Sequence, residues 1–380
     1  MSLINCRCME AAVRVPAIFS FTSSANKTFI SFPSLSFVSQ SSSRSIVSSS
    51  KVLSLRANYL LSHTRTMAVG SQNNAVVDTP AEGSESLFRT ALLSMENVYL
   101  GRNPTAKAVL DLVRSAGGNQ ICYDHFAYRT FGIDGYGIDS MAKFFLDFGY
   151  TRREELRFPA KKLRARWFAP PSYDNGIYFG GPLPRIFISE LLVDETSPQS
   201  QEVIKKYVKS LGNANNHAAL ASTLGCLTWE TPSYSDYQKL ARESEYAAWT
   251  LVNGFTVNHV TISVHRLKSN IGNINNLNHF IEDEGFKLNS EGGILKVSPD
   301  GLLLQSSTVA DSNVFNFSDG VSETVPFSYI EFAERLVLPQ YAKLTNEEIK
   351  EFHRRDGFEV GNADKIFEST SKDQIARKVA

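Results

Sequence analysis

The alternation of hydrophobic and polar positions predicts the same succession of elements twice along the chain. Alternating apolar residues indicate strands, and apolar residues three or four positions apart indicate helices. Each unit reads as strand, short helix and three further strands. The predicted segments are 120–131, 140–148, 152–159, 164–169 and 185–193, then 255–267, 274–284, 294–297, 301–308 and 327–338. This repeated pattern predicts an α+β protein in which two βαβββ units join their sheets into a half-barrel around a cavity.

Helical patterns surround and separate the two units. The stretch 87–116 predicts helices interrupted at 101–104, and the insert 196–252 predicts helices over 200–210 and 234–252. A further helix is predicted over 345–355, with Thr345 and Glu348 as a capping box. We therefore expect a single folded domain over 86–370, with units at about 118–195 and 253–340. The charged segment 371–380 is interpreted as a frayed tail.

The first part of the chain has the composition of an organelle-targeting segment. Residues 1–77 contain one acidic residue, Glu10, together with scattered Arg and Lys and dense Ser. Ser-rich, acid-poor N-termini are typical of transit peptides. We interpret 1–67 as a transit peptide for the chloroplast or another plastid such as the amyloplast, and 68–85 as a linker. The alternative is an ordinary disordered tail.

Composition and charge narrow the class of protein. The 380 residues carry 39 Lys+Arg and 39 Asp+Glu, which argues against binding to nucleic acid or to an anionic membrane by bulk charge. No apolar run approaches the roughly 20 residues that a membrane-spanning helix needs. Four cysteines do not form a disulfide framework. Cys122, three residues before His125, is interpreted as a buried thiol, with a catalytic nucleophile as the alternative.

Two histidines occupy corresponding places in the two predicted units. His125 lies on the first strand of unit one and shares its face with Arg129, which is about 13 Å further along. His259 lies in the middle of the first strand of unit two. His265 is about 20 Å beyond His259 on the same strand, too far to bind the same ion, and is interpreted as a rim residue. The other histidines of the folded part are interpreted as solvated or capping residues: His217, His279 and His353.

The last strand of unit two contains a carboxylate in an apolar setting. Glu331 lies between aromatic and aliphatic residues, and a buried carboxylate is costly unless it is paired or binds a metal. The alternatives are an ion pair of Arg335 with Glu331 or with Glu334. Two imidazoles and one carboxylate facing one cavity would form a 2-His-1-carboxylate triad, which leaves open positions on Fe(II) for a bidentate substrate and O₂.

Three motifs resemble one known family. DHFAYRTFG at 124–132, VNHVT at 257–261 and YIEFAERLVLP at 329–339 are similar to the 2-oxoadipate dioxygenase/decarboxylases, over about residues 86–370. The doubled pattern also resembles vicinal-oxygen-chelate enzymes. The resemblance implies Fe(II) held by His125, His259 and Glu331, with Arg129 as a substrate-binding residue. It also implies a substrate contact at Val360, although glycine follows where the family has serine.

The resemblance implies a reaction as well as a site. It implies that 2-oxoadipate and O₂ give 2-hydroxyglutarate and CO₂ in lysine catabolism, with no separate 2-oxo acid cosubstrate. The expected partners are a small 2-oxo acid and O₂, with neither nucleic acid nor membrane. Two alternatives stay open: a non-catalytic plastid protein that uses the cavity for binding and affects starch or storage metabolism, and a metal-dependent isomerase or lyase.

Overall fold

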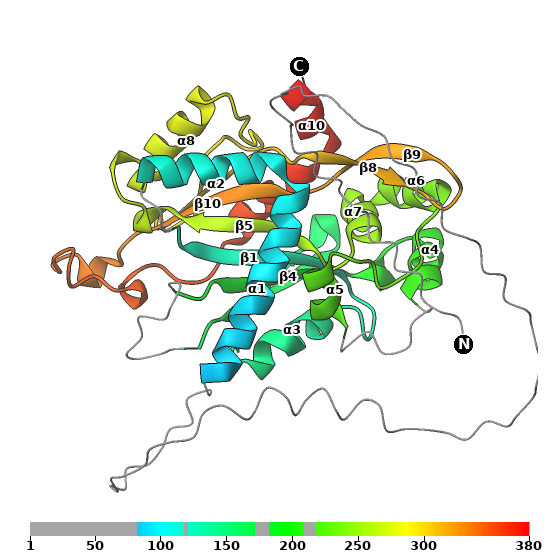
Figure 1. Ribbon diagram of the computed structural model, residues 1–380, viewed down its shortest axis with the longest axis horizontal. Helices are drawn as coiled ribbons and strands as arrows, with labels where there is room; N and C mark the ends of the chain where they lie inside the picture. The colour runs from blue at the N-terminus through cyan, green and yellow to red at the C-terminus, as the bar shows by residue number, and fades with distance from the viewer. Residues whose placement is uncertain (1–81, 118–120, 172–181, 209–216, 380) are drawn as a thin grey trace, which may run out of the picture. The chain divides into compact units, whose positions relative to one another are not determined.

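The structure is a computed structural model that describes residues 82–117, 121–171, 182–208 and 217–379. These residues belong to the unit Pro80–Ala380, and the predicted transit peptide and most of the linker lie outside them. Eight strands form one sheet (Figure 1). In spatial order they are β2 (Thr151–Phe158), β3 (Leu163–Ala169), β4 (Arg185–Leu191), β1 (Tyr123–Phe131), β5 (Val257–Ser263), β10 (Tyr329–Arg335), β7 (Leu303–Ser307) and β6 (Lys296–Val297).

The sheet confirms the predicted doubling of the βαβββ pattern. In each half the first strand pairs in parallel with the last, β1 with β4 and β5 with β10. The remaining strands of each half continue outward in antiparallel pairing. The halves meet where β1 and β5 pair antiparallel. The first strand of each unit therefore lies at the centre of the sheet, with the last strand of the same unit beside it.

Amphipathic helices pack on the sheet because their apolar residues recur at helical spacing. In the helix of unit one, α3 (Ile138–Asp147), Met141 and Phe145 are fully buried. The equivalent helix α8 (Ile274–Asp283) buries Leu277 and Ile281. Two longer helices, α1 (Glu82–Arg102) and α2 (Pro104–Gly117), contact the central strands β5 and β10 respectively (Figure 1).

The helical insert lies between the two units in sequence and at one end of the sheet in Figure 1. Its helices are α4 (Pro198–Val208), α5 (Ala218–Leu224), α6 (Tyr234–Glu243) and α7 (Glu245–Asn253). The predicted helix 234–252 is divided in two at Ser244, whose hydroxyl accepts a hydrogen bond from the amide of Ala247 and so starts α7. Ser233 caps α6 by accepting from the amide of Asp236.

Two segments near the C-terminus differ from prediction. The stretch 345–355 contains turns and a 3₁₀ turn (Glu351–His353) in place of a helix. Glu348 does accept hydrogen bonds from the amide and hydroxyl of Thr345, but the following chain is held in extended pairing by the bridge between Val337 and Arg354. The predicted frayed tail instead forms α10 (Lys372–Val379). A hairpin of β8 (Ser312–Asn316) and β9 (Ser322–Pro326), placed before β10, was not predicted.

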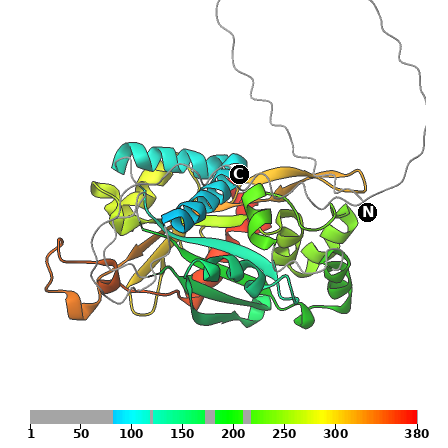
Figure 2. The same ribbon diagram turned by 60° about the horizontal axis from the view of Figure 1, so that its bottom comes forward.

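The C-terminal segment closes the hollow side of the sheet. Helix α9 (Val360–Ile366) contacts β2 at one edge of the sheet and both β6 and β7 at the other. An element of two turns can touch both edges only if the sheet curls around it, which is the predicted half-barrel. Figure 2 shows this red segment between strands of the two halves. A 3₁₀ turn, Phe367–Thr370, follows directly.

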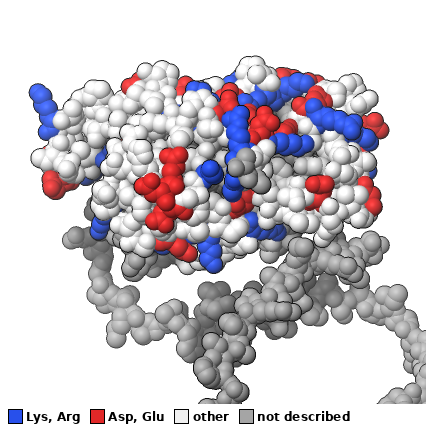
Figure 3. Space-filling view, turned by 90° about the horizontal axis from the view of Figure 1, so that it is seen from above, with Lys and Arg blue, Asp and Glu red and all other residues white. Residues whose placement is uncertain are grey.

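The surface carries charges of both signs. On the face in Figure 3, Lys and Arg side chains lie among Asp and Glu side chains. Among the described residues, no helix combines the length and apolar character needed to cross a membrane.

Candidate metal centre

The structure brings together the three side chains that the sequence singled out as metal ligands. His125 on β1, His259 on β5 and Glu331 on β10 come from three adjacent central strands, and all are buried. The Nε2 atom of His259 lies 3.0 Å from Oε2 of Glu331 and 3.4 Å from Nε2 of His125. His125 Nε2 is 3.8 Å from the same carboxylate oxygen. One ion can contact all three ligand atoms.

The outer nitrogen of each imidazole is held by the residue that precedes it. His125 Nδ1 donates to Oδ1 of Asp124 at 2.8 Å, and His259 Nδ1 donates to Oδ1 of Asn258 at 2.9 Å. Neighbours on a regular strand would point to opposite faces. Here the pairing of β1 with β5 shifts register at both places, so that Asp124 and Asn258 are each the extra residue of a bulge. Bulges re-aim side chains, and these two fix both histidines in one tautomer.

The protonation state of the cluster suits a cation. Because both Nδ1 atoms donate, the Nε2 atom of each ring faces the centre, and in the neutral ring it carries the lone pair that can bind a metal. Burial lowers the pKa of His259 to about 4 despite the opposing charge of Glu331. Burial alone would raise the pKa of Glu331, but His125 and His259 hold it below its ordinary value. Two lone pairs and an anionic oxygen therefore converge, an arrangement that a bound cation stabilises and that contains no thiolate.

Two further side chains contact the ligands. Gln305 on β7 donates from Nε2 to Oε1 of Glu331 at 2.6 Å, which leaves Oε2 directed at the histidines. The hydroxyl of Thr261 lies 3.0 Å from Nε2 of His125. Gln305 in turn accepts from Nδ2 of Asn362 on α9 at 3.1 Å, so the C-terminal helix is connected to the carboxylate ligand.

The space beside the triad is small. A cavity of about 20 Å³, roughly the room for one water molecule, adjoins the three ligands. A second cavity of about 290 Å³ is lined by Arg129, and Phe367 borders both. The other residues lining the smaller cavity are Phe187, Gln305, Tyr329, Phe358, Ala363 and Ile366.

Arg129 is buried without a carboxylate partner. Its guanidinium group lies over the rings of Trp249 (5.0 Å), Tyr246 (5.1 Å) and Phe367 (5.7 Å). One long hydrogen bond of 3.4 Å runs to the carbonyl of Phe367, and Nε has no partner. No Asp or Glu of the described residues forms an ion pair with it. The buried hydroxyl of Tyr329, which borders the metal cavity, makes no hydrogen bond of normal geometry with the described residues but interacts electrostatically with Arg129.

Val360 is not brought to either cavity. It is the first residue of α9, and its side chain is 39% exposed. From the same helix, Ala363 and Ile366 face the metal cavity instead. His265 lies apart from the triad, as predicted, with Nε2 3.3 Å from Glu351.

Sequence reasoning missed the residues that orient the ligands. Strand alternation places Asp124 on the face opposite His125, and only the bulge reverses this. The repeated pairs Asp-His and Asn-His were the available signal. The alternative ion pairs for Arg335 are wrong: Arg335 binds Asp124, while Glu334 accepts from the amide of Ile274 at the start of α8.

Comparisons with known proteins agree with the motifs. The family model described as 2-oxoadipate dioxygenase/decarboxylase matches residues 91–349. A protein of Oryza sativa subsp. japonica, named 2-oxoadipate dioxygenase/decarboxylase, chloroplastic/amyloplastic, is 68% identical over 82% of this chain and 86% of its own length. An Arabidopsis thaliana protein, named 2-oxoadipate dioxygenase/decarboxylase, chloroplastic, is 56% identical over 97% of this chain and 98% of its own. Both names confirm the predicted plastid location.

Solved structures agree on the fold. The crystal structure of the hydroxyglutarate synthase from Oryza sativa, in complex with 2-oxoadipate, matches with a TM-score of 0.77 at 68% identity, over 82% of this chain and all of that one. A putative glyoxalase superfamily protein from Ralstonia eutropha shares the fold at 20% identity, with a TM-score of 0.57 over 75% of this chain and 90% of that one. These matches show that the chain belongs to the 2-oxoadipate dioxygenase/decarboxylase family, in agreement with its motifs and its converging triad.

Proposed function

We propose that this protein is an Fe(II)-dependent dioxygenase that converts 2-oxoadipate and O₂ to 2-hydroxyglutarate and CO₂ in plastid lysine catabolism. The observation that carries the proposal is the convergence of His125, His259 and Glu331 in a family whose rice member was crystallised with 2-oxoadipate. The equation balances without a second organic substrate, because loss of C1 as CO₂ and entry of both oxygen atoms of O₂ into the remaining five carbons give 2-hydroxyglutarate.

The donor set supports iron as the metal. Two neutral imidazoles and one carboxylate form the facial set typical of non-haem Fe(II) oxygenases, with positions left for other ligands. When bound, Fe(II) supplies the one-electron chemistry that O₂ requires. The protein holds the ligands in register: Asp124 and Asn258 fix the ring tautomers, and Gln305 turns the carboxylate.

Arg129 is proposed to bind a substrate carboxylate. A guanidinium group that is buried and lacks an anionic partner is poised for one, and the planar fork matches a carboxylate. The hydroxyl of Tyr329 provides another donor at the edge of the metal cavity. The rings of Tyr246, Trp249 and Phe367 pack against the guanidinium group and shield it in part from water.

Binding requires the two cavities to join. A six-carbon dicarboxylate is larger than the space for one water beside the triad. Phe367 borders both that space and the larger cavity, and we propose that a change in its side-chain position connects them. Val360 is proposed to contact the substrate through its backbone, which needs α9 to shift toward the cavity.

The N-terminal composition supports import into the plastid. We propose that 1–67 is removed as a transit peptide, that 68–85 is a linker, and that 86–370 is the catalytic domain. N-terminal sequencing of the protein recovered from isolated plastids tests the boundary, and a mature N-terminus within the folded region would contradict it.

The test of the activity is oxygen uptake by protein loaded with Fe(II) under anaerobic conditions. A panel of 2-oxo acids is added, and 2-hydroxyglutarate and CO₂ are quantified with and without O₂. We expect turnover of 2-oxoadipate that requires O₂, and its loss in His125→Ala and Glu331→Ala. The exposed His279→Ala is the matched control and should be active. Product formed without O₂ would indicate a lyase or isomerase, and no product from iron-loaded protein would indicate a binding protein.

A further inference from the structure

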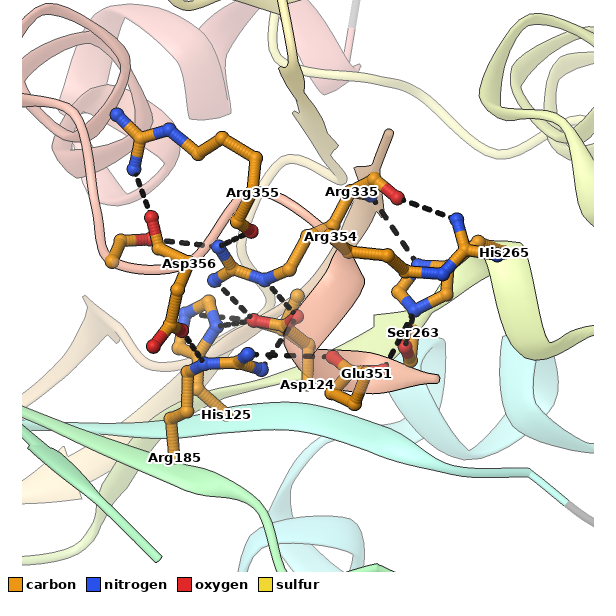
Figure 4. A network of polar contacts seen from close by, with 12 residues as sticks. Asp124, His125, Arg185, Ser263, His265, Arg335, Glu351, Arg354, Arg355 and Asp356 are labelled. Atoms are coloured by element: carbon orange, nitrogen blue, oxygen red, sulfur yellow. Dashed lines mark hydrogen bonds and ion pairs between the residues drawn. The ribbon is translucent and has the colours of Figure 1, made fainter. Parts of the chain in front are cut away.

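Asp124 connects the histidine ligand of β1 to a wider ion-pair network. Its two carboxylate oxygens accept from Nε of Arg335 at 2.6 Å and from Nη2 at 3.0 Å, while Oδ1 also accepts from His125 (Figure 4). Nη1 of Arg185 lies 3.4 Å from Oδ2. Burial alone would raise the pKa of Asp124, but Arg335 and Arg185 hold it well below its ordinary value.

Arg335 also binds the backbone just before Phe358, a residue that lines the metal cavity. Its Nη1 donates to the carbonyls of Gly357 at 2.7 Å and Arg355 at 3.1 Å. The next residue, Phe358, borders the metal cavity, and its ring centroid is 4.8 Å from that of His125. One fully buried guanidinium group thus contacts both the residue that orients His125 and the backbone that places Phe358.

The same segment is held from a second side. Arg185 on β4 binds Asp356 at 2.8 Å and Glu351 at 3.3 Å, in addition to Asp124. Figure 4 shows these groups gathered around Asp124 and Arg335. Residues 351–356 are therefore bound to β4 and β10, the two strands whose arginines contact the carboxylate of Asp124.

The two bulges differ in this respect. Asn258 orients His259 in the same way, but it carries no charge and its Nδ2 has no hydrogen-bond partner among the described residues. The ring of His259 is therefore not joined to the C-terminal segment by a charged group. Of the two histidine ligands, His125 is therefore the one whose polar contacts reach residues 351–358, whereas the carboxylate ligand Glu331 is connected to α9 through Gln305 and Asn362.

From these contacts we infer that Asp124 and Arg335 are positioning residues that couple the orientation of His125 to the placement of segment 351–358, whose last residue, Phe358, borders the metal cavity. The inference rests on the proposed metal site and adds to it a physical link between metal binding and ordering of segment 351–358. Arg335 suits this role because its fork can bind a carboxylate with two nitrogens and carbonyls with the third, which lysine cannot do.

The test measures Co(II) binding, by the visible absorption of the Co(II) protein, and hydrogen exchange of peptides covering 351–358. In the parental protein we expect added Co(II) to slow exchange in this segment, where the amide of Arg355 donates to the carbonyl of Leu336. Loss of an outer contact to a ligand typically weakens metal binding about 10- to 100-fold. We expect Asp124→Asn to fall in this range, and Arg335→Lys to abolish the effect of Co(II) on exchange.

A double variant and a matched control make the result specific. If the two residues act as a unit, Asp124→Asn/Arg335→Lys should bind Co(II) about as weakly as Asp124→Asn alone. Asp236→Asn removes another buried carboxylate, bound by Lys206 at 2.7 Å on the helical insert, and should leave Co(II) affinity unchanged.

The outcomes separate this inference from the proposed function. Parental protein that binds no Co(II) would show that the metal site itself is wrong, and the coupling with it. Parental binding together with equal affinity in a folded Asp124→Asn variant would refute only the positioning role. Unchanged exchange in 351–358 on metal addition, or the same slowing in Arg335→Lys, would refute the coupling to the segment.

Discussion

The same substitution at two buried arginines of this protein should affect different properties, the stability of the fold in one case and substrate binding in the other. Arg129 and Arg335 are 2% and 0% exposed, so replacement by methionine removes a buried charge and keeps most of the apolar contact in both cases. We predict that Arg335→Met greatly lowers the free energy of unfolding, and that Arg129→Met scarcely changes it but greatly weakens substrate binding.

The magnitude for Arg335 follows from its pairing. Its Nε and Nη2 bind Asp124, which is also buried, and Nη1 binds two carbonyls. Removing one partner of a buried pair leaves an uncompensated charge and costs about 3–5 kcal/mol. Arg185 stays near Asp124 at 3.4 Å and offsets part of this, which favours the lower end. Adding Asp124→Asn to Arg335→Met should recover part of the loss.

The magnitude for Arg129 follows from the lack of an anionic partner. Methionine forfeits three cation–π contacts, each worth up to about 2 kcal/mol at a desolvated site, but also removes the cost of burying an unpaired charge, which is several kcal/mol. The net change in the free energy of unfolding should stay within about 1 kcal/mol. Losing one partner of a desolvated ion pair with substrate costs about 2–5 kcal/mol. At about 1.4 kcal/mol per factor of ten, KM for 2-oxoadipate should rise roughly 30- to 3,000-fold.

The assay is urea denaturation of the metal-free proteins, followed by circular dichroism, alongside steady-state kinetics of the iron-loaded ones. Arg266→Met is the control for a surface charge, because its partner Glu351 is partly exposed, and it should cost less than about 1 kcal/mol. Equal destabilisation by Arg129→Met and Arg335→Met would refute the distinction between a substrate-binding and a structural arginine. An unchanged KM in Arg129→Met would remove its proposed role.

Three further predictions test other parts of the site. Burial lowers the pKa of Lys296 to about 8 from its ordinary 10.5, so the unfolded chain binds more protons than the folded one between these values, and the free energy of unfolding should rise with pH across that window. In urea denaturation at pH 7.5 to 10.5 this rise should be absent from Lys296→Met. The same dependence of stability on pH in both proteins would contradict the prediction. Gln305→Leu removes the hydrogen bond that turns Glu331, so Co(II) affinity measured by titration should fall about 10-fold or more, and retained affinity would count against that contact. Phe367→Ala should lower the free energy of unfolding by about 3–5 kcal/mol, because it removes a buried ring. By opening the space between the two cavities it should also raise turnover of longer 2-oxo acids relative to 2-oxoadipate. An unchanged ratio of these turnover rates would show that Phe367 does not separate the cavities.

Prediction from sequence succeeded where a local pattern decides the structure and failed where distant pairing does. The segment 345–355 has Thr345 and Glu348 at the capping-box spacing, and Glu348 accepts from the amide of Thr345, yet Val337 and Arg354 pair and hold the following chain extended. The predicted helix 234–252 is broken because Ser244 starts a new helix where the chain turns. In the first case propensity over a few residues is overridden by a contact that only the folded chain supplies, whereas the second break is local, because Ser244 caps α7 through the amide of Ala247.

The sequence by itself determined the doubled strand order and the strands that carry His125, His259 and Glu331, because alternation along a strand is a local property. The tertiary structure decided which residues contact and orient these side chains. Two register shifts between β1 and β5 turn Asp124 and Asn258 toward the imidazoles, and the curl of the sheet brings α9 over the cavity. These features depend on hydrogen-bond ladders between strands over a hundred residues apart, which no local periodicity encodes.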